Sequence, residues 1–191
     1  MKKGLLIILS GPSGVGKGTV RRQIMKKHMV DLTYSVSMTT REPRDKEVDG
    51  VDYYFVSEQQ FKDDIKKGNF LEYAEFVGHY YGTPKEKVES LRNAGKNVFL
   101  EIEINGAKQV MSNVKDDRVI SFFLMPPTFK ALENRIRKRK SESEEVIQER
   151  LAKGKKEMTM TDNYDYVIMN DKVGRAAREI IDLILKKQKE N

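Results

Sequence analysis

Near its start the sequence reads Leu5-Leu6-Ile7-Ile8-Leu9 and continues as Ser10-Gly11-Pro12-Ser13-Gly14-Val15-Gly16-Lys17-Gly18-Thr19. The apolar run is typical of a strand buried on both faces of a parallel sheet. Glycines in the loop after it let backbone N–H groups turn toward phosphate oxygens, and the following helix aims its free amides at the same anion. Lys17 matches the lysine of the G-x-x-x-x-G-K-[ST] pattern. We therefore predict a nucleoside triphosphate site formed by Gly11, Pro12, Ser13, Gly14, Val15, Gly16, Lys17, Gly18 and Thr19.

One position of this loop departs from the pattern. Residue 18 is glycine, and the hydroxyl follows one place later, at Thr19. Glycine-rich turns between a strand and a helix also occur without a phosphate. The preceding strand, the spacing from Gly11 to Lys17 and the helical pattern of Val20 and Ile24 favour phosphate binding here. Thr19 becomes the candidate hydroxyl for Mg²⁺, and which oxygen contacts the ion stays open.

Composition narrows the class of protein. A chain of 191 residues is long enough for one domain with a full core, and the absence of cysteine excludes disulfides and thiolate metal sites. The first apolar run is too short for a signal peptide or a membrane span, so we expect a cytoplasmic protein without a membrane partner. The net charge of +7 lies largely in mixed-sign helical stretches. We therefore expect no nucleic-acid partner, and positive charge around a cleft would instead attract nucleotides.

The rest of the chain alternates between strand and helix patterns. Further strands are predicted at 98–104, 119–124 and 166–169, with helices at about 105–115, 128–140, 144–162 and 173–185. This order predicts a doubly wound α/β core with a parallel sheet. Residues 34–90 break the alternation, because they are rich in aromatics and turn glycines, which favours an inserted, mostly antiparallel subdomain. The charge-dense stretch 135–145 is either a solvated surface or a mobile segment that closes over a phosphate.

The inserted region carries a specific resemblance. Thr39-Thr40-Arg41-Glu42-Pro43-Arg44, followed by Glu47, Gly50, Tyr53 and Phe55, resembles the signature segment of guanylate kinases, and the similarity runs over essentially the whole chain. The resemblance implies a P-loop nucleoside monophosphate kinase fold with a five-stranded parallel core sheet. It also implies reversible phosphoryl transfer from MgATP to GMP or dGMP, with Mg²⁺ as the cofactor. The implied parts are a core (1–33, 91–136 and 149–191), a GMP-binding insertion (about 34–90) and a lid (about 137–148).

The chemistry of GMP explains the residues that the resemblance assigns to it. A nucleoside monophosphate is a dianion, which arginines can bind through paired hydrogen bonds. Guanine presents N1–H and a 2-amino group as donors and O6 as an acceptor, so carboxylates and hydroxyls can read its edge. By resemblance, the GMP-binding residues are Ser37, Arg41, Arg44, Tyr53, Glu72, Tyr81, Thr83 and Glu103.

One segment departs from the family's usual form. Many guanylate kinases have Asp-Ile-Asp followed by Gln-Gly, whereas this chain has Glu101-Ile102-Glu103 and Asn105-Gly106. We expect strand alternation to point both carboxylates to one face. Glu101 is then a partner of Mg²⁺ through water, and Glu103 is a guanine contact.

Catalysis by such a site reduces to alignment and positive charge, because the attacking phosphate oxygen is already ionised and needs no base. Lys140 stands where the family usually has a glycine. Asn170 follows a strand and is either an adenine contact or an ordinary turn residue. The predicted catalytic cations are Lys17, Arg41, Arg135, Arg139 and Arg150.

Two other functions fit parts of the pattern. Guanylate-kinase-like domains also occur as inactive peptide-binding modules, but the loop glycines and Lys17 are intact here. A nucleoside monophosphate kinase with another acceptor is the second alternative, and the residue set Ser37, Arg41, Arg44 and Glu72 argues against it. The sequence leaves the oligomeric state open between monomer and homodimer.

Overall fold

The computed structural model describes residues 2–76, 78–138 and 143–190. Its core is a parallel sheet of five strands in the order β2-β7-β1-β8-β9, which confirms the predicted fold class. The strands are β1 (Leu6–Ser10), β2 (Leu32–Tyr34), β7 (Asn97–Glu101), β8 (Val119–Met125) and β9 (Tyr166–Met169). The first strand of the chain therefore lies at the centre of the sheet, between β7 and β8.

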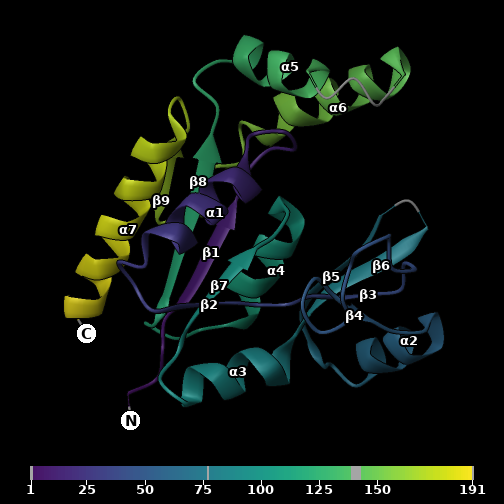
Figure 1. Ribbon diagram of the computed structural model, residues 1–191, viewed down its shortest axis with the longest axis vertical. Helices are drawn as coiled ribbons and strands as arrows, with labels where there is room; N and C mark the ends of the chain where they lie inside the picture. The colour runs from purple at the N-terminus through teal and green to yellow at the C-terminus, as the bar shows by residue number, and fades with distance from the viewer. Residues whose placement is uncertain (1, 77, 139–142, 191) are drawn as a thin grey trace.

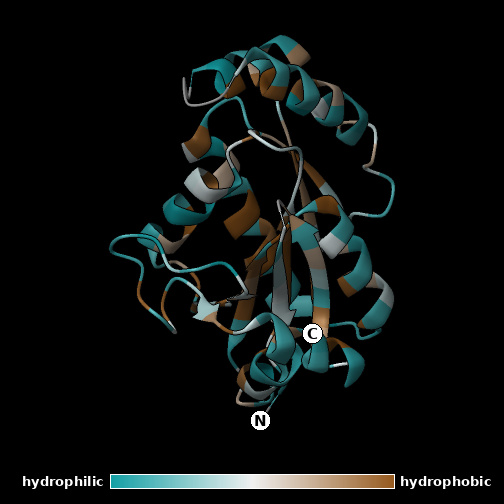
Figure 2. Cartoon of the chain, turned by 90° about the vertical axis from the view of Figure 1, so that its right-hand side faces the viewer, coloured by the Kyte–Doolittle hydropathy of each residue, from teal (hydrophilic) through white to brown (hydrophobic). Residues whose placement is uncertain are grey.

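Helices cover both faces of this sheet (Figure 1). Leu5, Ile7 and Leu9 pack toward α1 (Lys17–Lys27) and α7 (Val173–Glu190), whereas Leu6 and Ile8 pack toward α3 (Lys85–Asn93) and α4 (Ile104–Asn113). Successive side chains of a strand point to opposite faces, so one apolar run supplies two hydrophobic clusters. Figure 2 shows the same arrangement, with hydrophobic strands inside and largely hydrophilic helices outside.

A second sheet occupies the inserted region. Its strand order is β4-β3-β6-β5, and the β3–β6 and β5–β6 pairs are antiparallel, as predicted, whereas β3–β4 is parallel. The elements are β3 (Met38–Thr39), β4 (Tyr54–Phe55), α2 (Glu58–Lys66), β5 (Phe70–Phe76) and β6 (His79–Pro84). Figure 1 shows this sheet beside the core, with α4 on the side that faces it. Strand β5 packs directly on α4.

Two helices project beyond the end of the core sheet, α5 (Phe129–Arg137) and α6 (Glu144–Glu157), and they pack against each other (Figure 1). Helix α6 ends before residue 162, its predicted limit, and the Thr159 hydroxyl donates to the Lys156 carbonyl at 2.9 Å where it ends. Arg139 and Lys140 lie outside the described residues. In the part of the chain that the structure describes, no helix has the length and apolar character to cross a membrane.

The predicted strand 98–104 also ends early, and this corrects one expectation. Strand β7 stops at Glu101, and Glu103 is the N-cap residue of α4. Glu103 therefore lies outside the strand, and the prediction that strand alternation points both carboxylates to one face was wrong. Strand β7 has ended before Glu103, and α4 begins at Ile104 directly after it.

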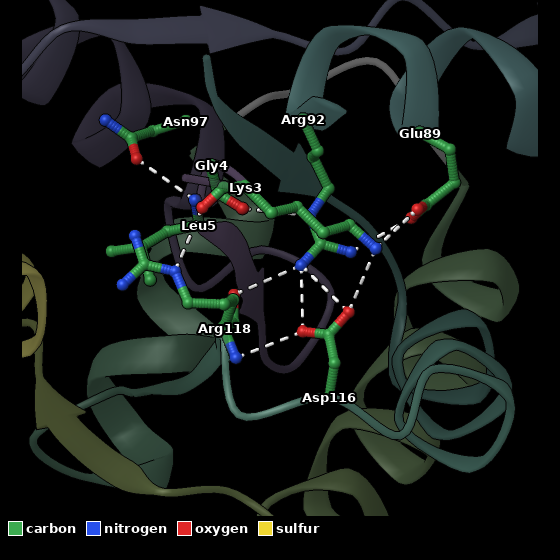
Figure 3. Close-up of polar contacts among 8 residues, drawn as sticks. All are labelled: Lys3, Gly4, Leu5, Glu89, Arg92, Asn97, Asp116 and Arg118. Atoms are coloured by element: carbon green, nitrogen blue, oxygen red, sulfur yellow. Dashed lines mark hydrogen bonds and ion pairs between the residues drawn. The ribbon is translucent and has the colours of Figure 1, made fainter. Parts of the chain in front are cut away.

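A buried arginine, Arg92, links three segments of the core (Figure 3). Arg92, near the end of α3, is fully buried and donates to the Gly4 carbonyl at 3.1 Å. Its other nitrogens bind Glu89 and Asp116, each at 2.9 Å. Burial by itself raises the pKa of the Asp116 carboxyl, but hydrogen bonds from Arg92 and its charge outweigh burial and lower the pKa. The cluster ties α3, the start of β1 and the loop before β8 into one unit.

We expect Asp116→Asn to lower the free energy of unfolding at pH 7 by about 1–3 kcal/mol, because a charged acceptor of Arg92 is lost. A carboxyl with a depressed folded-state pKa adds stability above its unfolded pKa, and this is lost as the pH falls through the folded-state pKa. The difference between wild type and variant should therefore shrink below about pH 4. Urea unfolding across pH, with the exposed Asp182→Asn as control, measures this. Equal effects of the two variants would contradict the assignment.

Candidate active site

The phosphate loop lies between β1 and α1, at the carboxyl end of the central strand. Gly11 has φ +145°, and a Cβ on it would lie 2.4 Å from the Leu124 carbonyl oxygen, so β8 leaves no space for a side chain. Gly16 caps α1 at φ 101°. The first turn of α1 contains no acidic residue. Its free amides therefore remain available to an anion, which is the property that the sequence pattern predicts.

Lys17 folds back over this loop. Its Nζ donates to the carbonyl oxygens of Gly11 at 2.7 Å and Pro12 at 3.3 Å. Burial lowers the pKa of the Lys17 ammonium, and nearby carboxylates, chiefly that of Glu103, oppose part of this effect. Because the half-buried Lys17 ammonium is partly withdrawn from water, binding of an anion beside it is favourable.

Helix α6 holds the loop at Ser13. The Ser13 N–H donates to Glu157 Oε2 at 3.1 Å, and Arg150 donates to Ser13 Oγ at 3.1 Å. Lys153, on the same helix, pairs with Glu157 at 3.6 Å and with Glu103 at 3.1 Å. These contacts connect the phosphate loop through α6 to the start of α4.

A second set of contacts holds the loop at Val15. Arg135 donates to the carbonyl oxygens of Val15 at 2.9 Å and Asn170 at 2.6 Å. The Asn170 side-chain amide donates to the same Val15 oxygen at 2.8 Å, and its Oδ1 is buried with no hydrogen-bond partner among the described residues. Asn170 therefore supports the loop and keeps one acceptor for a further donor. The adenine contact stays a prediction.

Two side chains that carry oxygen atoms, Glu101 and Thr19, lie beside the loop at the predicted Mg²⁺ position. A Cβ at Gly18 would lie 3.3 Å from Glu101 Oε1, so the glycine at this position leaves room for the carboxylate. Glu101 accepts from Arg21 Nε at 2.7 Å, and the Thr19 hydroxyl accepts from Arg22 at 3.3 Å. No cluster of three or more metal-binding side chains occurs in residues 2–76, 78–138 and 143–190. This donor set fits Mg²⁺, which usually takes one or two protein oxygens together with phosphates and water.

The predicted phosphate-binding residues lie in the connection between β3 and β4 and on β6. Arg41 donates to both carboxylate oxygens of Glu47 at 2.9 Å, and its guanidinium lies 5.5 Å from the ring centroid of Tyr53. The rings of Tyr53 and Tyr81 lie 6.1 Å apart, edge to face. The Arg44 N–H donates to Glu47 at 2.8 Å, while the Arg44 side chain is exposed. The structure therefore brings Arg41, Tyr53 and Tyr81 together, whereas Arg44 joins this group only through its backbone N–H.

Glu72 and Thr83 form a pair between β5 and β6. The Thr83 hydroxyl donates to Glu72 Oε1 at 2.5 Å, and both side chains are buried. Burial raises the pKa of the Glu72 carboxyl, and the bonds from Thr83 oppose that rise. Ser37 is half-buried just before β3. The Glu103 side chain is 59% exposed and binds Lys153, so in this structure it belongs to the contact with α6.

Two contributors to this site were not assigned from the sequence. Glu157 lies in a helix whose mixed charges suggest a solvated face, and no local pattern distinguishes it. Glu47 is part of the quoted signature segment, and its spacing of six from Arg41 was the available signal. Arg139 is not among the described residues.

A phosphate loop on the central parallel strand, an inserted sheet that carries arginines and a helical pair over the loop define a P-loop nucleoside monophosphate kinase fold. The sequence model of the family "Guanylate kinase" matches residues 3–187. The chain belongs to the guanylate kinase family.

Individual relatives agree with this assignment. A guanylate kinase of Mesoplasma florum is 50% identical over 186 residues, which are 97% of this chain and 62% of that protein. A guanylate kinase of Lactiplantibacillus plantarum is 51% identical over 183 residues, covering 96% of this chain and 88% of that protein. The crystal structure of guanylate kinase from Anaplasma phagocytophilum superposes with a TM-score of 0.76 at 30% identity, covering 98% of this chain and 87% of that one. The chain thus spans less than two thirds of the Mesoplasma florum relative and most of the other two.

Proposed function

We propose that this chain is an active guanylate kinase, which transfers the γ-phosphoryl group of MgATP to GMP and produces ADP and GDP. The observation that carries the proposal is the set of contacts made at the start of α4. Glu103 is the N-cap residue of this helix and pairs with Lys153 of α6, the helix that holds Ser13 of the phosphate loop, while Glu72 of the inserted sheet packs on Gly106 in the first turn of α4. A site for a triphosphate and a site for an acceptor base therefore meet at one helix N-terminus.

We assign the donor side to residues 11–19, with Lys17, Arg135, Arg150 and Arg139 as the cations that neutralise the transferring phosphate. Thr19 and Glu101 are the residues proposed to hold Mg²⁺, which when bound neutralises phosphate charge. Arg135 and Arg150 bind backbone and side-chain oxygens of the loop here, so they are already within its reach. Their role is alignment and charge stabilisation, which are the main demands of phosphoryl transfer.

We assign the acceptor side to the inserted sheet. The Arg41 guanidinium would exchange its contacts with Glu47 for the GMP phosphate, and the exposed side chain of Arg44 would bind the same phosphate. Tyr53 and Tyr81 would line that phosphate site. Glu72 would accept from the donor edge of guanine while Thr83 fixes its orientation, with Ser37 supplying a hydroxyl. Adenine offers no matching donors at N1 and C2, so AMP would leave the buried carboxylate of Glu72 poorly paired.

The division into moving parts follows the same assignment. We propose a core at 1–33, 91–136 and 149–191, a GMP-binding insertion at about 34–90 and a lid at about 137–148. The contacts of α6 with Ser13 offer a path by which lid closure would adjust the phosphate loop. ATP and GMP are the proposed small-molecule partners, dGMP is a further acceptor, and the cytoplasm is the expected location.

An assay of ADP release from ATP, run with GMP, AMP, CMP and UMP in parallel, tests the function. We expect turnover with GMP far above that with the other acceptors. No ADP formation with any acceptor would support the inactive peptide-binding alternative. Faster turnover with another nucleotide would support the other-acceptor alternative.

Lys17→Ala is expected to lower kcat by about a hundredfold or more, because a preorganised cation at the transferring phosphate is lost. Folding should be retained, because the contacts that Lys17 Nζ makes with described residues are two hydrogen bonds to carbonyl oxygens of the loop itself. Steady-state kinetics and a thermal melt measure both quantities, with the exposed Lys26→Ala on the same helix as the control. Nearly unchanged turnover in the Lys17 variant would refute the phosphate assignment.

Glu72→Gln is expected to raise the KM for GMP by about 10- to 100-fold, because an amide cannot accept both guanine donors as a carboxylate does. The KM for ATP should stay nearly constant. Glu75→Gln, an exposed change on the same strand, is the matched control. Equal increases in both KM values for the Glu72 variant would rule out a specific role in reading guanine.

A further inference from the structure

Gly106 lies in the first turn of α4, directly against the carboxylate of Glu72. A Cβ on Gly106 would lie 2.5 Å from Glu72 Oε2 and 3.1 Å from its Cδ. Real side chains do not approach so closely, so the present position of this carboxylate requires a residue without a side chain at 106. Gly106 is buried together with Glu72.

The carboxylate is held from two sides. Thr83 Oγ1 donates to Oε1 at 2.5 Å, while the bare backbone of Gly106 lies against Oε2. The two contacts come from different parts of the molecule, because Thr83 belongs to the inserted sheet and Gly106 to a core helix. The orientation of Glu72 therefore depends on how closely β5 approaches α4.

That approach is fixed by a third residue. The Gln109 side chain accepts from the Tyr73 N–H at 3.1 Å and donates to the Tyr73 carbonyl at 3.0 Å. Gln109 lies about one turn after Gly106 on α4, and Tyr73 follows Glu72 on β5. Since the backbone of β5 is held on the helix next to Glu72, a collision at residue 106 is relieved by movement of the Glu72 side chain.

We propose that Gly106 is a positioning residue for acceptor recognition, whose missing side chain sets where the Glu72 carboxylate meets the base. This inference rests on the proposed role of Glu72 as the guanine reader. A methyl group at 106 would turn the carboxylate away from its bond with Thr83 and from the base edge. The carboxylate is the far end of a flexible side chain, so it gives way without disrupting the fold, and recognition is lost rather than folding.

Gly106→Ala is therefore expected to raise the KM for GMP by about 10- to 100-fold, which is the effect of misplacing one charged hydrogen-bond acceptor. The KM for ATP should stay within about twofold of wild type. Gly174→Ala is the matched control, because Gly174 also lies in the first turn of a helix, α7, and a Cβ there meets nothing within 4 Å. That variant should leave both KM values unchanged.

The decisive measurement combines Gly106→Ala with Glu72→Ala, which removes the colliding group. In the Glu72→Ala background we expect Gly106→Ala to have no further effect on the KM for GMP. An undiminished effect in that background would overturn the inference, because Gly106 would then act through something other than Glu72. An unchanged KM in the single Gly106 variant would also overturn it.

Two further outcomes separate this inference from the proposed function. If Glu72→Ala itself leaves the KM for GMP unchanged, the assignment of Glu72 as the guanine reader fails. If Glu72→Ala raises that KM and Gly106→Ala does not, only the role of Gly106 fails. Thermal melts address folding: destabilisation by Gly106→Ala that disappears in the Glu72→Ala background supports the contact, and equal destabilisation in both backgrounds refutes it.

Discussion

Burial of β1 on both faces is the constraint on which the rest of the structure depends. Leu5 to Leu9 are completely buried, and the strand lies between β7 and β8 with helices above and below. The strand is hydrogen-bonded to β7 along one edge and to β8 along the other, so its carboxyl end is fixed relative to both neighbours. The loop at 11–19 starts from that fixed point, and Leu124 of the neighbouring strand limits its path at Gly11. In open α/β sheets, ligands bind at this end of the strands.

Polar contacts from other segments hold the phosphate loop in place at Ser13 and Val15. Ser13 is held by Glu157 and Arg150, and Val15 is held by Arg135 and Asn170. Each of these side chains comes from a segment far along the chain, after β8. The loop is thus shaped by its own glycines and held from outside by the helical pair and the strand β9. Because these contacts hold the loop from outside, a glycine-rich segment that is flexible in isolation presents its amides in a defined arrangement.

The sequence predicted those features that depend on local pattern. The phosphate loop, the central strand and the parallel core follow from apolar runs and glycine spacing, and the inserted sheet follows from aromatic and turn residues. The error at Glu103 arose because alternating residues look alike in a strand and at a helix start, and only the end of β7 at Glu101 and the start of α4 at Ile104 separate them. Glu157 and Gly106 could not be assigned because their roles depend on contacts between segments distant in sequence. Periodicity carries no information on such contacts.

The side-chain amide of Gln109 affects whether another strand can pair with the open edge of β5. Strand β5 is an edge strand, and edge strands carry backbone groups that can pair with another chain. At Tyr73 both outward groups are already bonded to Gln109, so a side chain takes the place that a neighbouring strand would occupy. The residue that holds β5 on α4 thereby also blocks strand addition at this point.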